Sequence, residues 1–324
     1  MCGGCVGADR AGAKIASEPA ALIAWFREIG LAMARIGLEA GPLSQWLYAA
    51  MREAGLAVEL LETRHVRDAF KAMPVKTDRK DARGIAQLMR LGWFRSVHCK
   101  SLPAQETRAL LTARKLVQSK HHDTEMSLRG ILCGFGLKVG KTSQRTFASR
   151  VHELVAGHPT LLLVAEALLA ARAVLGEQLS KLEKRVRSLA RHDRLMSAPG
   201  VGAVVALTFV AAIDDPARFR SSKAVGAHFG LTPKKYQSGE TDMTGRISKI
   251  GDAGVRTMLY EAANVIMTKP VKGSLLKSWA MRLALRAGMR KAKVALARKL
   301  AVVLHRMLAD DTEFVADKAA TAAV

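Results

Sequence analysis

The chain has 324 residues, and its 51 Lys and Arg against 28 Asp and Glu give a formal net charge of +23 at pH 7. A hydrophobic share of 49% excludes a wholly disordered chain, and this length can bury the core of one large domain or of two smaller ones. A pI near 10.4 is extreme for a metabolic enzyme and indicates a polyanionic partner. Nucleic acid is the first candidate for that partner, and an anionic membrane surface is the second.

A membrane partner is not expected, because the most apolar stretches, 161–171 and 198–213, are shorter than the roughly 18 residues that span a bilayer. The N-terminus lacks the basic segment and apolar core of a secretory signal. Cys2 and Cys5 have the spacing of zinc ligands, but no second pair follows to complete a structural zinc site. Isolated cysteines in a basic chain are typical of a reducing cytoplasm, where we expect the protein.

The pattern of apolar residues in the first hundred positions predicts alternating helices and strands. We expect helices over 18–31, 42–55 and 76–91, and strands over 33–39 and 56–61. A strand, a helix and a second strand at this spacing form a crossover unit, so the two strands are expected to pair in parallel.

From Leu102 to Leu195 the pattern is helical and strongly charged, with a glycine-rich bend over 130–140. Leu182, Val186 and Leu189 form one apolar stripe, which suits either a helix packed in its own domain or a dimer seam. A polar segment, 237–252, is expected to be a loop and is followed by more helix to about Leu308. The predicted divisions are a partial α/β domain over 1–100, a helical or coiled-coil connector over 101–194, a mostly helical domain over 195–309 and a frayed tail over 310–324.

Asp78 and Asp81 are three residues apart at the start of the helix predicted over 76–91, so both carboxylates lie on one face. They repel unless a cation lies between them, although Asp in a first turn, beside a capping Thr77, is also favoured by the helix dipole alone. Glu39 ends an apolar strand, where parallel sheets place their sites. The three carboxylates together predict a Mg²⁺ site for phosphate chemistry.

The segment Pro199-Gly200-Val-Gly202 opens an apolar helix, as the turn of a helix-hairpin-helix element does. In that element the glycines bring backbone N–H groups close to a nucleic-acid phosphate, with a helix N-terminus behind them. An ordinary glycine turn between helices is the alternative. We therefore name Gly200 and Gly202 as candidate DNA contacts.

Ser238 precedes a glycine in the polar segment, with cations on both sides of it: Lys234, Lys235, Arg246 and Lys249. A serine can attack phosphorus when neighbouring cations hold the phosphate and stabilise the developing charge, and Arg246 and Lys249 are our candidates for that role. No His–Asp pair accompanies the serine, so activation as in a protease is not expected. By composition alone, a Ser-Gly pair in a basic loop is most often a turn.

The last predicted helices, 269–306, contain eleven Lys and Arg and no Asp or Glu. A solvated helix face usually mixes both signs, so a face of one sign indicates a phosphate backbone as the partner. The eleven cations are Lys269, Lys272, Lys277, Arg282, Arg286, Arg290, Lys291, Lys293, Arg298, Lys299 and Arg306.

The order and spacing of these motifs resemble the DEDD-type serine transposases of insertion sequences, the IS110 family, which is related to the Piv invertase. The resemblance runs from about Ser17 to Leu308 and rests on six pieces: Gly37-Leu-Glu39-Ala, Lys76-Thr-Asp78-Arg-Lys-Asp81-Ala-Arg83, Pro199-Gly-Val-Gly202, Phe229-Gly-Leu-Thr-Pro233, Gln237-Ser238-Gly239 and Gly245-Arg-Ile-Ser-Lys-Ile-Gly251. It implies a RuvC-like domain of RNase H fold, a helical connector that mediates assembly as a dimer or tetramer, and a C-terminal transposase domain with the helix-hairpin-helix element.

The resemblance also implies that acidic residues bind Mg²⁺ while a serine forms a covalent phosphoserine link to DNA. Glu39, Asp78 and Asp81 match the second, third and fourth acids, and Ser238 matches the nucleophile. Family members also bind a structured bridge RNA, and the high positive charge of this chain agrees with such a partner. The family's first acid lies on an opening Gly-Ile-Asp strand, which we do not find before Glu39; Asp9 is the one nearby Asp and reads as part of a turn.

We therefore expect an N-terminally truncated domain that lacks its first strand and its first metal ligand. The leading function is a DNA recombinase that uses a Mg²⁺-assisted serine. A metal-dependent DNA nuclease, in which Ser238 is structural, is one alternative. An inactive DNA-binding remnant of a transposase is the other.

Overall fold

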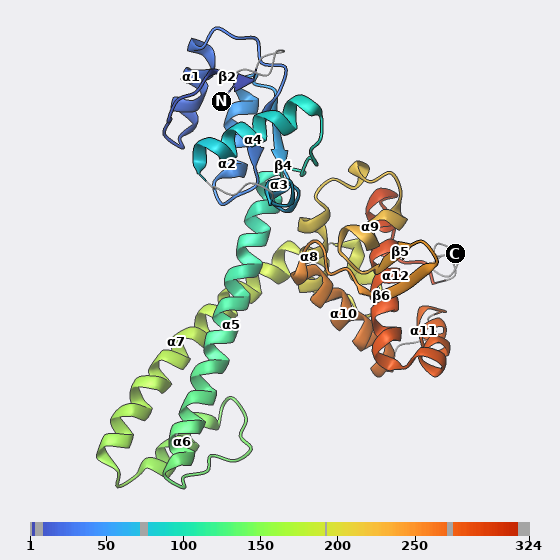
Figure 1. Cartoon of the computed structure of the whole chain (residues 1–324). Coiled ribbons are helices and arrows are strands. Elements are labelled where there is room, and N and C mark those ends of the chain that lie inside the picture. Colours follow the sequence, from blue (N-terminus) through green and yellow to red (C-terminus); the bar gives the residue numbers. More distant parts are fainter. Residues whose placement is uncertain (1, 4–8, 72–76, 192, 271–274, 317–324) are drawn as a thin grey trace. The chain divides into compact units, whose positions relative to one another are not determined.

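The computed structural model describes residues 2–3, 9–71, 77–191, 193–270 and 275–316, with side chains from residue 12 onward. It divides into two compact units, Met1–Ser101 and Leu102–Val324 (Figure 1). The described residues are mostly helical, with three two-stranded sheets. Cys5, Lys76 and Lys272 lie outside the described residues.

The N-terminal unit contains the predicted crossover. Its elements are β1 (Cys2–Gly3), β2 (Asp9–Ala11), α1 (Pro19–Glu28), β3 (Ile36–Glu39), α2 (Ser44–Glu53), β4 (Val58–Leu61), α3 (Thr63–Phe70) and α4 (Asp78–Leu91). Strands β3 and β4 pair in parallel, with Ile36 opposite Val58 and Glu39 opposite Leu61, which confirms the expected pairing. Asp9 was expected in the turn of a hairpin; β1 and β2 do pair antiparallel, but Asp9 itself is the first residue of β2 and not part of a turn.

Helix α4 approaches β3 closely because Gly37 has no side chain. A Cβ atom at Gly37 would lie 2.7 Å from Ile85 Cγ2 and 2.8 Å from Met89 Cγ, inside van der Waals contact. Thr77 caps the helix, accepting a hydrogen bond from the Lys80 N–H at 3.2 Å, and Gly92 ends it in the left-handed conformation. The helix that carries the two aspartates is therefore held against the strand that carries Glu39.

The C-terminal unit begins with a helical arm of α5 (Leu102–Gly134), α6 (Phe147–Val155) and α7 (Pro159–Leu189). This confirms the helical stretch predicted from Leu102, and the predicted bend falls where α5 ends. Phe147 and Val151 of α6 are fully buried against Leu128 and Leu132 of α5, so the arm has its own core. By length and composition α7 could cross a membrane, the one such helix in the described part of the chain, and Ala165 on it is fully buried in this core.

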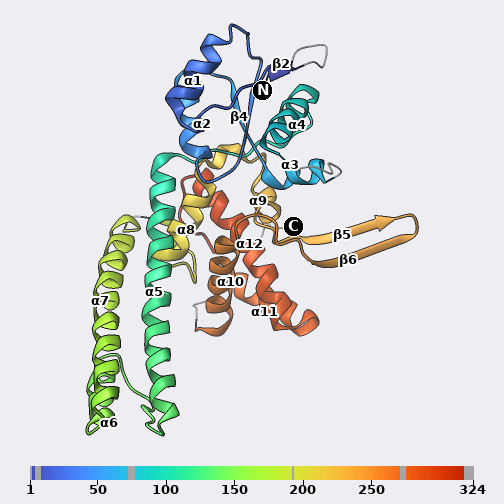
Figure 2. The same ribbon diagram turned by 60° about the vertical axis from the view of Figure 1, so that its left-hand side comes forward.

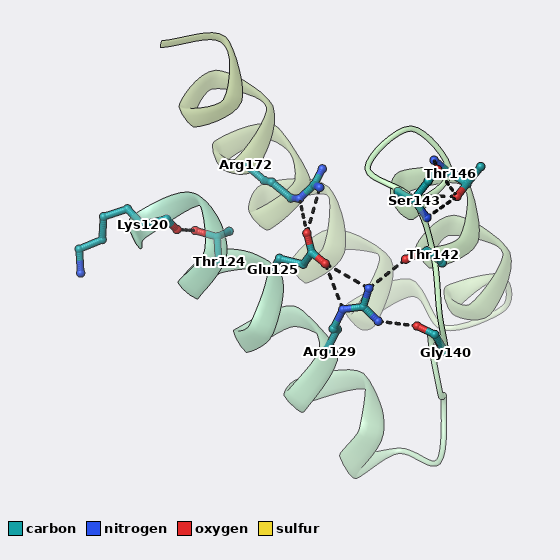
Figure 3. Close-up of polar contacts among 9 residues, drawn as sticks. All are labelled: Lys120, Thr124, Glu125, Arg129, Gly140, Thr142, Ser143, Thr146 and Arg172. Atoms are coloured by element: carbon teal, nitrogen blue, oxygen red, sulfur yellow. Dashed lines mark hydrogen bonds and ion pairs between the residues drawn. The ribbon is translucent and has the colours of Figure 1, made fainter. Parts of the chain in front are cut away.

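A partly buried ion cluster joins the helices of the arm (Figure 3). The Glu125 carboxylate of α5 pairs with Arg129 at 3.1 Å and with Arg172 of α7 at 3.0 Å. Arg129 also donates to the Gly140 carbonyl at 2.7 Å, which ties the connecting loop to α5. Burial raises the pKa of Glu125, but the two guanidinium groups outweigh it and hold that pKa below its usual range.

The remaining elements form a helical bundle: η1 (Arg194–Ser197), α8 (Ala203–Ile213), η2 (Pro216–Arg218), α9 (Ser222–His228), α10 (Ala253–Thr268), α11 (Leu275–Ala287) and α12 (Met289–Ala309). Helix α12 packs against α9, α10 and α11, and its Leu296, Leu300 and Leu304 are fully buried. Of the predicted stripe, Val186 is buried against Leu207 of α8, Leu182 is partly buried and Leu189 is 43% exposed, so packing within the domain accounts for only part of the stripe.

A β-hairpin replaces the loop expected over 237–252, so that expectation is wrong for most of the segment. Strands β5 (Pro233–Ser238) and β6 (Thr241–Ile247) pair antiparallel, and Figure 2 shows them projecting from the bundle as an arm. We call residues 233–247 the ribbon. Polar composition suggested a loop, but the inward-facing backbone groups of the two strands pair with each other, and the outward-facing ones remain open to water.

Candidate functional site

The three predicted metal ligands lie on β3 and α4. Glu39 is the last residue of β3 and is partly buried, whereas Asp78 and Asp81 lie in the first turn of α4. Glu39 shares the face of β3 that carries Gly37, and Asp81 lies one turn before Ile85 on α4. Because Gly37 packs against Ile85, Glu39 and Asp81 belong to the two faces that meet.

These carboxylates are not gathered into a closed metal site. Among the described residues, no group of three His, Cys, Asp or Glu side chains is close enough to hold a metal ion. Asp78 is exposed and Asp81 is partly exposed. The side chain of Asp9 lies outside the described residues. The donors are hard carboxylate oxygens, which suit Mg²⁺ chemically, but the described residues do not preassemble a site.

Ser238 lies at the tip of the ribbon. It is paired with Thr241 across a two-residue turn formed by Gly239 and Glu240. Gly239 has φ of +55°, a conformation that glycine adopts readily and that two-residue hairpin turns require at their first central position. The serine is therefore exposed at the end of an arm, and the glycine that follows it has a conformational reason to be there.

No residue of the ribbon is buried, and only Ile247 at its base is even partly covered. Tyr236 lies opposite Met243 on the face of the ribbon that also carries Ser238, and both side chains are about two-thirds exposed, at 66% and 65%. On the other face, Lys235 pairs with Asp242 across the strands at 3.1 Å. The fold gains nothing from exposing these two large apolar side chains beside Ser238. Exposed apolar groups of this kind are typical of a surface that contacts a partner.

Two glycines hold the base of the ribbon against α9. A Cβ atom at Gly230 would collide with the backbone of Ile250, and one at Gly251 would collide with the His228 carbonyl oxygen. Both glycines also have positive φ, +67° and +81°, so a side chain there is disfavoured by the backbone conformation as well as by the collision. Arg256 of α10 then donates to the carbonyls of Ile250 and Gly251 at 3.0 Å, an anchor that the sequence analysis missed.

The predicted cations are spread along the ribbon. Lys234 and Lys235 are on β5, Arg246 is near the end of β6, and Lys249 follows the strand. Arg246 is five residues from Thr241, which is about 16 Å at about 3.3 Å per residue. Arg246 and Lys249 therefore lie at the base of the ribbon, away from the serine at its tip, and they do not surround Ser238 within one chain.

The two glycines named as DNA contacts differ in their surroundings. A Cβ atom at Gly200 would lie 2.6 Å from the Ala262 carbonyl oxygen, so Gly200 is needed for packing against α10. Gly202 is exposed, has open space around it and precedes the first turn of α8. Gly202 is thus free to approach a phosphate, whereas Gly200 has a structural role that needs no ligand.

Two sequence models of known families match this chain. A transposase model named for the DEDD enzymes of IS110 matches residues 13–135, and one described as "Transposase IS116/IS110/IS902 family" matches residues 192–276. The transposase for insertion sequence element IS1111A of Coxiella burnetii is 29% identical over 83% of this chain and 75% of its own length. A probable family 20 transposase of Pseudomonas aeruginosa is 25% identical over 86% of this chain and 84% of its own length. The transposase for IS1328 of Yersinia enterocolitica is 24% identical over 86% of this chain and 85% of its own length.

Proposed function

Because the chain belongs to the IS116/IS110/IS902 family of insertion-sequence transposases, we propose that it cuts and rejoins DNA through Ser238. In the proposed step the Ser238 hydroxyl oxygen forms a bond to phosphorus while the bond to the departing deoxyribose oxygen breaks. The proton of Ser238 ends on that departing oxygen. The product is a covalent phosphoserine link, which conserves the energy of the phosphodiester for rejoining.

The observation that carries this proposal is the position of Ser238, exposed at the tip of a ribbon that has no buried residue. A nucleophile on such an arm can enter a DNA groove without disturbing the bundle behind it. Lys234 lies on the same strand, four residues before the serine, and supports the approach of a phosphate, whereas Lys235 is on the other face, paired with Asp242, and remains a proposed contact to DNA. Arg246 and Lys249 at the ribbon base, with Gly200 and Gly202, remain proposed contacts to the DNA farther from the scissile bond.

Glu39, Asp78 and Asp81 would hold Mg²⁺ in an N-terminal domain of RNase H-like fold, of which the parallel pair β3–β4 is a part. A divalent cation bound there stabilises negative charge on a phosphoryl oxygen. The chemistry of the carboxylates supports this assignment, and the packing of α4 on β3 brings two of the three onto facing surfaces.

We further propose a homo-oligomer, a dimer or tetramer, in which Ser238 of one chain acts beside the carboxylates of another. An arm that extends from its own unit supports action between chains. A guide RNA is a second proposed partner, and it is supported by a net charge of +23, which exceeds what a few contacts at a cleavage site require. Because the proposed substrate is DNA, we also propose that the protein acts in the cytoplasm.

The test is to incubate the purified protein with end-labelled DNA of an insertion-sequence end and Mg²⁺, then denature and separate the products. We expect a protein–DNA adduct that survives denaturation and is lost in Ser238→Ala. Thr241→Ala, opposite Ser238 at the tip, is the matched control and should retain the adduct.

Two outcomes would contradict the serine mechanism. Free cleaved DNA with no adduct would indicate a metal-dependent nuclease instead. Salt-sensitive binding without cleavage at any Mg²⁺ concentration would indicate an inactive DNA-binding protein.

A further inference from the structure

A large cavity lies at the base of the ribbon, at the end opposite Ser238. Its volume is about 1180 Å³, it is open to solvent on one side, and its lining includes Pro233 and residues 244–247 of the ribbon, Trp279 of α11 and several residues of α12 between 290 and 302. All these elements belong to the C-terminal unit. The proposed cleavage chemistry uses none of this cavity except Arg246, which was assigned to DNA binding in general terms.

All the acidic or basic side chains that line the cavity are positively charged. Six of the lining residues are Lys or Arg, and none is Asp or Glu: Lys223, Arg246, Arg290, Lys291, Arg298 and Lys299. Arg246, Arg290, Lys291 and Arg298 form no ion pair with any described residue of the chain. Cations that remain exposed without internal partners indicate an anionic ligand from outside.

The cavity also has an apolar lining, which a site for a bare phosphate does not need. Leu231, Ile247, Val294 and Val302 contribute aliphatic surface, and Trp279 contributes an indole ring. Lys299 lies in the same wall with its Nζ 4.7 Å from the centre of the Trp279 ring, and the residue as a whole is only 7% exposed. An aromatic ring with aliphatic walls can bind a flat, weakly polar group, and the surrounding cations can bind anionic groups attached on either side of it.

We infer that this cavity receives an unpaired nucleotide of the DNA strand bound by the ribbon, with its base against Trp279 and its flanking phosphates on Arg290, Lys291 and Arg298. The inference rests on the proposed function, because it takes DNA as the substrate. A base that is stacked in a duplex has no free face, so the cavity discriminates for unpaired nucleotides. Base stacking on an aromatic side chain tolerates any sequence, since every base has a π-face.

The first test measures binding by fluorescence anisotropy, using a duplex with one unpaired thymidine and the same duplex without it. We expect wild-type protein to prefer the bulged duplex. Trp279→Leu should lose about tenfold of that preference while its affinity for the flush duplex is unchanged. Trp279→Phe keeps a ring and should keep most of the preference. Trp93→Leu, which changes an exposed tryptophan of the N-terminal unit, is the matched control.

The second test separates the cavity from general charge. Arg290→Gln combined with Lys291→Gln should reduce the preference for the bulged duplex. Arg282→Gln combined with Arg286→Gln removes the same charge from α11 outside the cavity lining. This double variant should lower the affinity for the bulged and the flush duplex equally. Equal effects of the two double variants on the preference would overturn the inference. So would a wild-type protein without preference, or a preference that Trp279→Leu and Trp279→Phe both retain.

The same bulge in an RNA duplex identifies the source of the nucleotide. A Trp279-dependent preference with DNA assigns the nucleotide to the DNA strand as inferred, whereas one seen with RNA alone overturns that assignment in favour of an RNA strand. Failure of the proposed serine chemistry is separately visible. A protein that forms no adduct but shows the Trp279-dependent preference keeps the cavity assignment, and one that forms the adduct without the preference loses it.

Discussion

The helical arm of α5, α6 and α7 and the ribbon of β5 and β6 both extend from the C-terminal bundle, but different forces hold them. The helical arm contains its own core around Phe147 and a partly buried ion cluster around Glu125. The ribbon buries none of its residues and depends on cross-strand pairs and on the glycines at its base.

This contrast indicates where to look for function. In the helical arm, packing and charge pairing account for the identity of the buried residues. In the ribbon, folding accounts for Gly239 at the turn and for the glycines at the base, and it leaves Tyr236, Ser238 and Met243 without a structural reason. Residues that a fold does not need are the ones available to bind DNA and to react with it.

The largest expected effect is on the helical arm. Glu125→Gln leaves the buried Arg172 guanidinium, 10% exposed, without its counter-charge and should lower the free energy of unfolding by about 3 kcal/mol. Urea denaturation followed by circular dichroism measures this. Glu177→Gln, which removes an exposed pair with Lys181 on the same arm, should leave the free energy of unfolding nearly unchanged. Similar losses from both variants would show that the cluster does not stabilise the arm.

At the ribbon base, Gly230→Ala should destabilise the protein by about 1–3 kcal/mol, because it adds a Cβ against the Ile250 backbone at a positive φ. Gly245→Ala, on the ribbon itself, meets nothing closer than 3.7 Å and should be nearly neutral. Thermal unfolding of both variants makes the comparison. A neutral Gly230→Ala would mean that the base is not held by close backbone contact.

Asp252 links the bundle to α5, since its carboxylate pairs with Arg108 at 2.8 Å and caps α10 through the Gly254 N–H. Burial raises its pKa, but the Arg108 pair and the backbone N–H groups outweigh burial and lower it below the ordinary value of 3.8. A lowered folded pKa means that this stabilisation is complete above the unfolded value and is lost as pH falls through the folded one.

Asp252→Asn keeps the cap and removes the charge, so we expect it to cost about 1 kcal/mol at pH 7. The difference from wild type should shrink as pH falls below 3.8. Urea denaturation of both proteins across this pH range measures it. A difference that stays constant to the lowest pH would exclude Asp252 ionisation as its cause.

The smallest expected effect on stability is on the ribbon face beside Ser238. Met243→Thr should change the free energy of unfolding by less than about 0.5 kcal/mol, because Met243 is 65% exposed. The same variant should reduce formation of the protein–DNA adduct. Full adduct formation would mean that this face does not contact DNA, and a large loss of stability would mean that the fold depends on Met243.

Several elements could be predicted because they depend on neighbours in the chain. Apolar spacing located the parallel pair β3–β4, and the cap at Thr77 marked the start of α4. The long helices from Leu102 onward followed from the same periodicity. Placing Glu39 at the end of its strand needed only the end of the apolar run.

Other features depend on contacts between distant residues. The ribbon was predicted as a loop because its composition is polar, and only strand pairing makes it regular. Arg256 lies within a helix and gave no signal of its role at the ribbon base. Trp279 was one aromatic residue in a long cationic segment, and only the fold places it in the wall of the same cavity as Arg246 of the ribbon.

The sequence by itself determined the family, the positive charge and the order of the carboxylate and serine motifs, because these are properties of residue type and spacing along one chain. Tertiary structure alone decided that Ser238 stands at the tip of an arm, that Arg246 lies at its base and that Gly200 is needed for packing. The physical reason is that reach, burial and close backbone approach are set by the packing of separate segments, which local periodicity does not encode.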